Sequence, residues 1–157
     1  MKKNDMQCPA DEFAQTVYPP EQQPEGRYFE GGAYRDTDSG KHDYEGFLNP
    51  LPLSAFGEYM TEHRLQSDGT MRDSDNWQAG IPMPQYMKSM LRHVFDVWAI
   101  HRGLFVYKER KDGREITHVT AHYHVEPGWR LVDMKEALCA VWFNTQGYLF
   151  EWLKENE

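Results

Sequence analysis

Two polar, glycine-containing turns, each leading into a helical pattern, constrain the fold of this chain more than any other feature. The first turn covers residues 35–41 (Arg-Asp-Thr-Asp-Ser-Gly-Lys), and the second runs from Ser74 to Pro82. Apolar residues at helical spacing follow both turns. The helix expected after the second turn carries four polar residues, Lys88, Arg92, His93 and Asp96. Basic groups, turn amides and helical carboxylates are what a protein needs to hold a polyphosphate through a divalent metal.

Composition excludes several classes of protein. The chain has 157 residues, enough for one domain with a single core, and a formal net charge of -8. This charge argues against bulk electrostatic binding to nucleic acid or to an anionic membrane. No apolar run approaches the roughly 20 residues that span a bilayer. Cys8 and Cys139 are the only cysteines, so we expect no disulfide framework and a cytoplasmic location.

The chain is predicted to be mainly α-helical, with one domain behind a flexible N-terminal arm. Residues 1–30 show no sustained period and contain several prolines, which is typical of an arm. Residues 31–157 form the predicted domain. Its helices are expected from Pro52 or Ser54 to Gln66, from Pro84 to His101, and from Val132 to Glu155. Ser54 is the expected N-cap of the first of these helices.

A β-hairpin is expected as an insertion at residues 104–128. Asp112-Gly113 lies between two β-rich runs, which is a strong hairpin signal. The second strand is expected from Ile116 to Val125, and its alternation places three histidines on one face: His118, His122 and His124. These histidines are a candidate zinc or copper site, although a polar hairpin face is the simpler interpretation. The insertion could cover a cleft, contact a second protomer, or do neither.

Carboxylates on three different helices are the candidate metal ligands. We expect Glu58, Glu62, Asp96 and Glu136 to meet at one cleft if the helices pack around one core. Facing carboxylates repel unless a cation lies between them, and Mg²⁺ prefers oxygen ligands shared with substrate phosphates. The alternative is that these residues are the solvated faces of amphipathic helices.

Basic and aromatic residues near the turns are the candidate substrate contacts. Lys41, Lys88 and Arg92 are expected to bind phosphate oxygens. Asn76 and Trp77 are expected to bind the base or sugar, although Trp77 could equally be a core anchor. Arg92 has a competing role as an ion-pair partner of Asp96, four residues further along the helix.

The order of the motifs resembles one known family. The resemblance covers roughly residues 31–103 and 132–153, and it rests on these segments: Arg35-Asp36-Thr37, Ser39-Gly40-Lys41, Tyr44-Glu45-Gly46-Phe47-Leu48, Ser74-Asp75-Asn76-Trp77-Gln78, Gly80-Ile81-Pro82, Tyr86-Met87-Lys88-Ser89-Met90, Arg92-His93, Asp96-Val97-Trp98, Glu136-Ala137-Leu138-Cys139-Ala140, Phe143-Asn144 and Gly147-Tyr148-Leu149. Together they resemble the phage-type dATP/dGTP diphosphohydrolase domain, a relative of the MazG-like all-α NTP pyrophosphatases.

The resemblance implies a MazG-like helical bundle that is a homo-oligomer and uses Mg²⁺ or Mn²⁺. It implies hydrolysis of a (deoxy)nucleoside triphosphate, a purine dNTP, to the monophosphate and pyrophosphate, in the host cytoplasm if the protein is phage-encoded. The positions carried over by matching the motifs are Arg35, Lys41, Asn76, Trp77, Lys88, Arg92, His93, Asp96, Glu136 and Asn144.

Roles for these positions are our assignments. His93 and Glu62 are the expected catalytic residues, which orient or activate water. Arg35, Lys41, Asn76, Trp77, Lys88, Arg92 and Asn144 are the expected substrate contacts. Two alternatives from other classes remain open: a protein that sequesters a nucleotide without turnover, and a protein-interaction module. The family's Glu-X-X-Glu spacing is replaced here by Glu58 and Glu62, four residues apart, which favours the first alternative.

Overall fold

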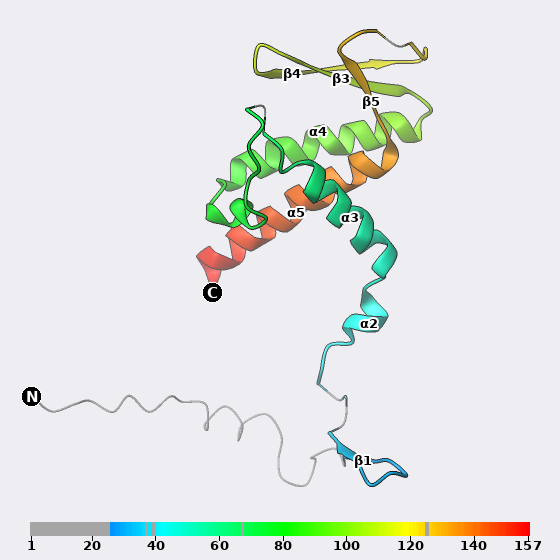
Figure 1. Cartoon of the computed structure of the whole chain (residues 1–157), viewed down its shortest axis with the longest axis vertical. Coiled ribbons are helices and arrows are strands. Elements are labelled where there is room, and N and C mark those ends of the chain that lie inside the picture. The colour runs from blue at the N-terminus through cyan, green and yellow to red at the C-terminus, as the bar shows by residue number, and fades with distance from the viewer. Residues whose placement is uncertain (1–25, 37, 39, 67, 125) are drawn as a thin grey trace, which may run out of the picture. The chain divides into compact units, whose positions relative to one another are not determined.

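The fold is mainly helical, with a three-stranded antiparallel sheet (Figure 1). The computed structural model describes residues 26–157 except 37, 39, 67 and 125. Most of the expected N-terminal arm (residues 1–25), including Cys8, therefore lies outside the described residues. The chain divides into two compact units between Phe47 and Leu48, whereas we placed the start of the domain at residue 31.

The described residues of the first unit form three short elements. Strands β1 (Arg27–Tyr28) and β2 (Tyr34–Arg35) form an antiparallel pair, and α2 (Tyr44–Phe47) is a single helical turn. The Arg27 guanidinium forms an ion pair with the Asp38 carboxylate within this unit. Lys41 is exposed, and its backbone N–H donates to the Asp38 carbonyl at 3.1 Å, which closes the polar turn expected there.

The second unit is built on three helices. They are α3 (Pro50–Glu62), α4 (Met83–His101) and α5 (Met134–Asn156), with the 3₁₀ helix η2 (Asn76–Ala79) between α3 and α4. The three predicted helices are present, but the predicted end of the first at Gln66 is wrong, because α3 ends at Glu62. Ser54 as the first N-cap is wrong, because α3 starts four residues earlier, where the Asn49 side chain accepts from the Leu51 N–H at 2.9 Å. Asp133 caps α5 by accepting from the Glu136 N–H at 2.7 Å.

Helices α4 and α5 run antiparallel and make the most extensive helix contact of this unit. Tyr86, near the start of α4, is 1% exposed and packs edge-on against Phe143. Its ring lies against Gly147, where an added Cβ would be 2.3 Å from a ring carbon. The expectation that small residues on α5 leave room for a neighbour is met here by the Tyr86 ring.

Strands β3 (Phe105–Lys111), β4 (Arg114–Thr120) and β5 (Trp129–Val132) form an antiparallel sheet in the order β4-β3-β5. The predicted turn is confirmed, with Asp112 and Gly113 both at positive φ. The predicted extension of the second strand to Val125 is wrong, because β4 ends at Thr120. His122 and His124 therefore do not share a strand face with His118. Strand β5 was not predicted.

The sheet is part of the hydrophobic core. Val106 and Val132 pack with Ala99 of α4 and Ala137 of α5 in one buried cluster. Because the two alanines are small, the sheet can approach the helix pair closely. Figure 1 shows the sheet on the side where α4 ends and α5 begins. Removal of residues 104–128 would take Val106 out of this buried cluster. The sheet is therefore part of the folded unit and not a separate addition to it.

The helical spacing of apolar residues between Met87 and Trp98 predicts a buried face on α4, but most of these side chains are exposed. Tyr86, Asp96 and Ala99 are the buried residues of this helix. The predicted core residues that remain at least 38% exposed are Met87, Leu91, Val94, Phe95 and Trp98. The helix therefore presents its polar Asp96 to the sheet and leaves an apolar stripe uncovered within the described part of the chain.

Gly147→Ala is expected to destabilise the protein by about 1–3 kcal/mol, because the new methyl group overlaps the buried Tyr86 ring. Gly57→Ala on α3 is the matched control, since nothing lies within 4 Å of its added Cβ. The higher helix propensity of alanine should stabilise the Gly57→Ala variant by up to about 1 kcal/mol. Urea unfolding of both variants measures the difference, and equal stabilities would contradict the close contact.

Candidate functional site

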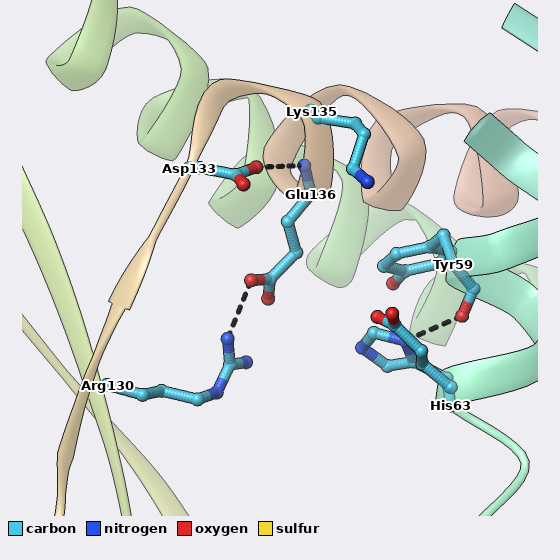
Figure 2. Close-up of a pocket in the computed structure, with 7 residues that line it drawn as sticks. Tyr59, His63, Arg130, Asp133, Lys135 and Glu136 are labelled. Carbon is cyan, nitrogen blue, oxygen red and sulfur yellow. Dashed lines mark hydrogen bonds and ion pairs between the residues drawn. The ribbon is translucent and has the colours of Figure 1, made fainter.

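Two adjoining cavities lie along α3 and share three of its lining residues, Tyr59, Glu62 and His63. The first cavity has a volume of about 410 Å³ and lies between α3, β5 and the start of α5. Its other lining residues are Arg130, Asp133, Lys135 and Glu136. In Figure 2, Tyr59 and His63 face the opening from one side, and Arg130 and Glu136 face each other on the other side.

Ion pairs organise the first cavity. Arg130, from β5, donates to the Glu136 carboxylate at 2.6 Å, and the Glu136 side chain is 21% exposed. Hydrogen bonding to Glu136 raises the pKa of Arg130. Lys135 contacts Glu58 at 3.3 Å, but both side chains are more than half exposed, so this pair contributes little to stability. The carboxylates of this cavity are thus partly neutralised by the protein's own cations.

Tyr59 forms the wall between α3 and α5. The His63 ring lies 4.0 Å from the Tyr59 ring, and its Nδ1 is 2.8 Å from the Tyr59 carbonyl. Burial, followed by the nearby Glu136 carboxylate, raises the pKa of the Tyr59 phenol. The phenol therefore stays protonated at neutral pH and can donate as well as accept a hydrogen bond.

The second cavity has a volume of about 330 Å³ and contains the predicted nucleotide contacts Asn76 and Trp77. A β-bridge between Leu65 and Met71 closes the preceding loop. Trp77 packs edge-on against Phe150 at 5.2 Å, and its carbonyl accepts from the Tyr86 hydroxyl at 3.3 Å. Trp77 is therefore anchored to the helix pair while it also lines the cavity, and its contact with a base or sugar stays a prediction.

A third cavity, of about 430 Å³, lies between α4 and the sheet and contains a buried charge cluster. Asp96 lies 3.0 Å from Lys108 Nζ and 3.3 Å from His93 Nδ1, and Lys108 lies 3.5 Å from Glu115. Asp96 and Lys108 are 3% and 5% exposed. Burial alone would raise the pKa of Asp96, but hydrogen bonds from His93 and Lys108 hold it below its usual value.

The structure brings together only some of the predicted site residues. Glu62 and Glu136 line one cavity, Glu58 lies beside it through Lys135, and Glu62 also lines the cavity of Asn76 and Trp77. The expectation that Asp96 joins these carboxylates is not met, since it lies in the third cavity with His93 and Lys108. Among the described residues, no three Asp, Glu, His or Cys side chains form a metal-binding group.

The remaining predicted contacts of the second unit lie outside the two adjoining cavities. Lys88 is exposed on α4, and Arg92 donates to Ser89 Oγ at 3.0 Å. Asp96 forms its ion pair with Lys108 rather than with Arg92, its predicted alternative partner. Asn144 is buried, and its amide donates to the Ala140 carbonyl at 2.7 Å on its own helix. Arg35 and Lys41 belong to the first unit.

Several residues of the cavities were not predicted from the sequence. The largest group consists of basic side chains: Arg64, Arg72, Lys108, Arg110, Arg130 and Lys135. The period of two in β3 places Lys108 and Arg110 on the same face as the buried Val106. This alternation is present in the sequence, but it indicates an inward-facing charge only once the burial of Val106 is known.

Lys108→Met is expected to destabilise the protein by about 3–5 kcal/mol at pH 7, because it leaves the buried Asp96 carboxylate without its lysine. Since the folded pKa of Asp96 is depressed, the stability that this carboxylate contributes is present above the unfolded pKa of about 3.8 and is lost as the pH falls through the folded value. Asp96→Asn should therefore destabilise at pH 7 and approach the wild type near pH 2. Urea unfolding at both pH values measures this, and a pH-independent difference would contradict it.

Comparison with known proteins gives no match. No family model, no curated protein and no solved structure is similar to this chain at a significant level. In the described part of the chain, no helix has the length and apolar character needed to cross a membrane. The family resemblance of the motifs therefore stays a prediction.

Proposed function

We propose that the protein hydrolyses a (deoxy)nucleoside triphosphate, a purine dNTP by the family resemblance, to the monophosphate and pyrophosphate with Mg²⁺ or Mn²⁺. One observation carries the proposal: Glu62 lines two adjoining cavities, one with Glu136 and Asp133 and the other with Asn76 and Trp77. Carboxylates suited to a metal-bound phosphate chain thus adjoin an aromatic and an amide suited to a base.

Two carboxylates, Glu62 and Glu136, line the first cavity as candidate Mg²⁺ ligands, since the Asp133 side chain caps α5. The described residues hold no group of three metal-binding side chains, so Mg²⁺ would be held by these two carboxylates together with substrate phosphates and water. When bound, the ion would supply charge neutralisation and lower the pKa of a water molecule. We assign Glu62 and Glu136 as its ligands, and Glu58 as a ligand only if it leaves Lys135.

The roles of the chain's own residues follow from their positions. Glu62 is placed to accept a proton from water, because it lines both cavities. Asn76 and Trp77 orient the base, and Arg130 neutralises phosphate charge when it leaves Glu136. His93, our other predicted catalytic residue, is outside this mechanism because it contacts Asp96 in the third cavity.

A nucleotide-sequestering protein is the second candidate function. Its supporting observation is that Glu136 and Glu58 are already paired with Arg130 and Lys135, so the cavity holds its carboxylates together without a metal. Such a protein would bind a triphosphate tightly and release no product. The same assay therefore separates the two candidates.

Glu62→Gln is expected to lower pyrophosphate release by 10²-fold or more, because it removes a proton acceptor and a metal ligand. A panel of NTPs and dNTPs with Mg²⁺ or Mn²⁺ is incubated with protein, and pyrophosphate and monophosphate are quantified. Glu155→Gln, at an exposed position of α5, is the control and should keep full activity. Inorganic phosphate as the product, or tight binding without turnover, would contradict the hydrolytic proposal.

We also propose that the protein is a homo-oligomer, with a second copy covering the apolar stripe of α4. Met87, Leu91, Val94 and Trp98 recur at intervals of four, three and four residues, and all are exposed. This is the spacing of a coiled-coil seam, which is self-complementary in a twofold dimer. Each such side chain contributes roughly 1.5–3 kcal/mol when it is buried.

Leu91→Glu is expected to convert a dimer into a species of 18.5 kDa, because it places a charge in the apolar seam. Gln85→Glu is the matched control, since it adds the same charge to α4 away from the stripe. Light scattering after gel filtration measures both masses. A wild-type protein of 18.5 kDa over a range of concentrations would contradict the proposal and leave the stripe available for a different protein.

A further inference from the structure

Three arginines from separate parts of the chain line the second cavity. Arg64 follows α3, Arg72 lies in the loop before η2, and Arg110 lies near the end of β3. The acidic lining residues are Glu62 and Asp73. In a chain with a net charge of -8, a cavity lined by more arginines than carboxylates is locally unlike the rest of the protein.

The backbone holds two of these arginines together. The Arg72 N–H donates to the Arg64 carbonyl at 3.0 Å, and Arg64 Nε donates to the Arg72 carbonyl at 2.7 Å. These two hydrogen bonds flank the bridge between Leu65 and Met71. Both arginines line the same cavity, where a bound anion would offset the repulsion between their like charges.

The sheet supplies the third arginine. Along β3, Val106 is fully buried, Lys108 is 5% exposed, and Arg110 follows on the same face. The cross-strand neighbour of Arg110 is Glu115. Glu115 instead contacts Lys108 at 3.5 Å, and Arg110 is one of the residues that line the second cavity.

Pairing distinguishes these arginines from the other basic residues of the site. Arg130, Lys135 and Lys108 each have a carboxylate partner within 3.5 Å. Within the part of the chain that the structure describes, no ion pair joins Arg64, Arg72 or Arg110 to a carboxylate. Guanidinium groups bind phosphate oxygens in bidentate geometry, so the partner that fits this cavity is a phosphate-bearing anion.

We infer that Arg64, Arg72 and Arg110 bind the polyphosphate of a nucleotide whose base lies toward Asn76 and Trp77. The inference rests on the proposed function and deepens it, because it adds phosphate contacts in the second cavity to Arg130 in the first, on either side of the shared Glu62, in place of the predicted Lys41, Lys88 and Arg92. It also gives the inserted sheet a direct role: Arg110 makes the site prefer a triphosphate to a monophosphate.

The test is binding of an α,β-imido deoxynucleoside triphosphate and of the monophosphate, measured by isothermal titration calorimetry. Arg110→Gln and Arg72→Gln should each raise the triphosphate Kd by about 10- to 100-fold, the usual loss for a charge-assisted hydrogen bond. Their monophosphate Kd should change by less than about 3-fold. Arg110→Lys should recover part of the loss, since it keeps the charge.

Arg114→Gln is the matched control, because Arg114 lies in the same hairpin, is exposed, and lines none of the three cavities. It should bind both ligands as the wild type does. Equal losses for triphosphate and monophosphate in the Arg110 variant, or no loss, would overturn the inference.

A third ligand, inorganic tripolyphosphate, separates failure of the inference from failure of the proposed function. If the wild type binds tripolyphosphate but no nucleotide, and Arg110→Gln weakens that binding, the anion site stands and the nucleotide function fails. If the wild type binds nucleotide and Arg110→Gln is unchanged for all three ligands, the nucleotide function stands and the arginine site fails.

Discussion

The buried ion pair between Asp96 of α4 and Lys108 of β3 is the contact on which the arrangement of the second unit depends. Both groups are almost fully buried, and their separation is 3.0 Å. Because a buried charge without a partner is costly, only a sheet placement that joins these two residues is favourable. A shift of β3 by one residue would turn Lys108 outward and leave Asp96 unpaired.

This one constraint also sets the two adjoining cavities. Lys108 pairs across strands with Arg130 and lies two residues before Arg110, so all three basic residues share the inner face of the sheet. Arg130 then meets Glu136 in the first cavity, and Arg110 reaches the second. The polar half of the inner face thereby borders the proposed site, while its apolar half (Val106, Val119 and Val132) packs on the helices.

Local patterns in the sequence predicted the helices and the hairpin turn well. The Asp112-Gly113 turn was found because only a few residue types adopt two successive positive φ angles. Strand β5 was missed because Trp129–Val132 is short and directly follows a Pro-Gly pair. Its alternation of apolar and polar residues is too short to predict a strand. The face of α4 was misjudged because its apolar stripe looked like a core face, whereas a charged residue, Asp96, faces the sheet.

The site was predicted less completely than the fold. Glu62, Asn76 and Trp77 line one cavity, as residues at turns and helix ends often do, and their roles stay predictions. We grouped Asp96 with carboxylates that lie in other cavities. The spacing of residues along a helix shows which side of the helix a side chain lies on, but not which neighbouring element that side contacts. Arg64, Arg72 and Arg110 could not be grouped from the sequence, since only the closed loop and the strand register bring them to one place.

The small residues beneath the sheet have a consequence for evolutionary change. Ala99 and Ala137 are buried in one cluster with Val106 and Val132 of the sheet. An ancestor or descendant that lacked residues 104–132 would expose these two alanines and a flat strip of helix backbone around them. We therefore expect gain or loss of the sheet to require compensating larger side chains at both positions, so that the insertion and the helices beneath it change together.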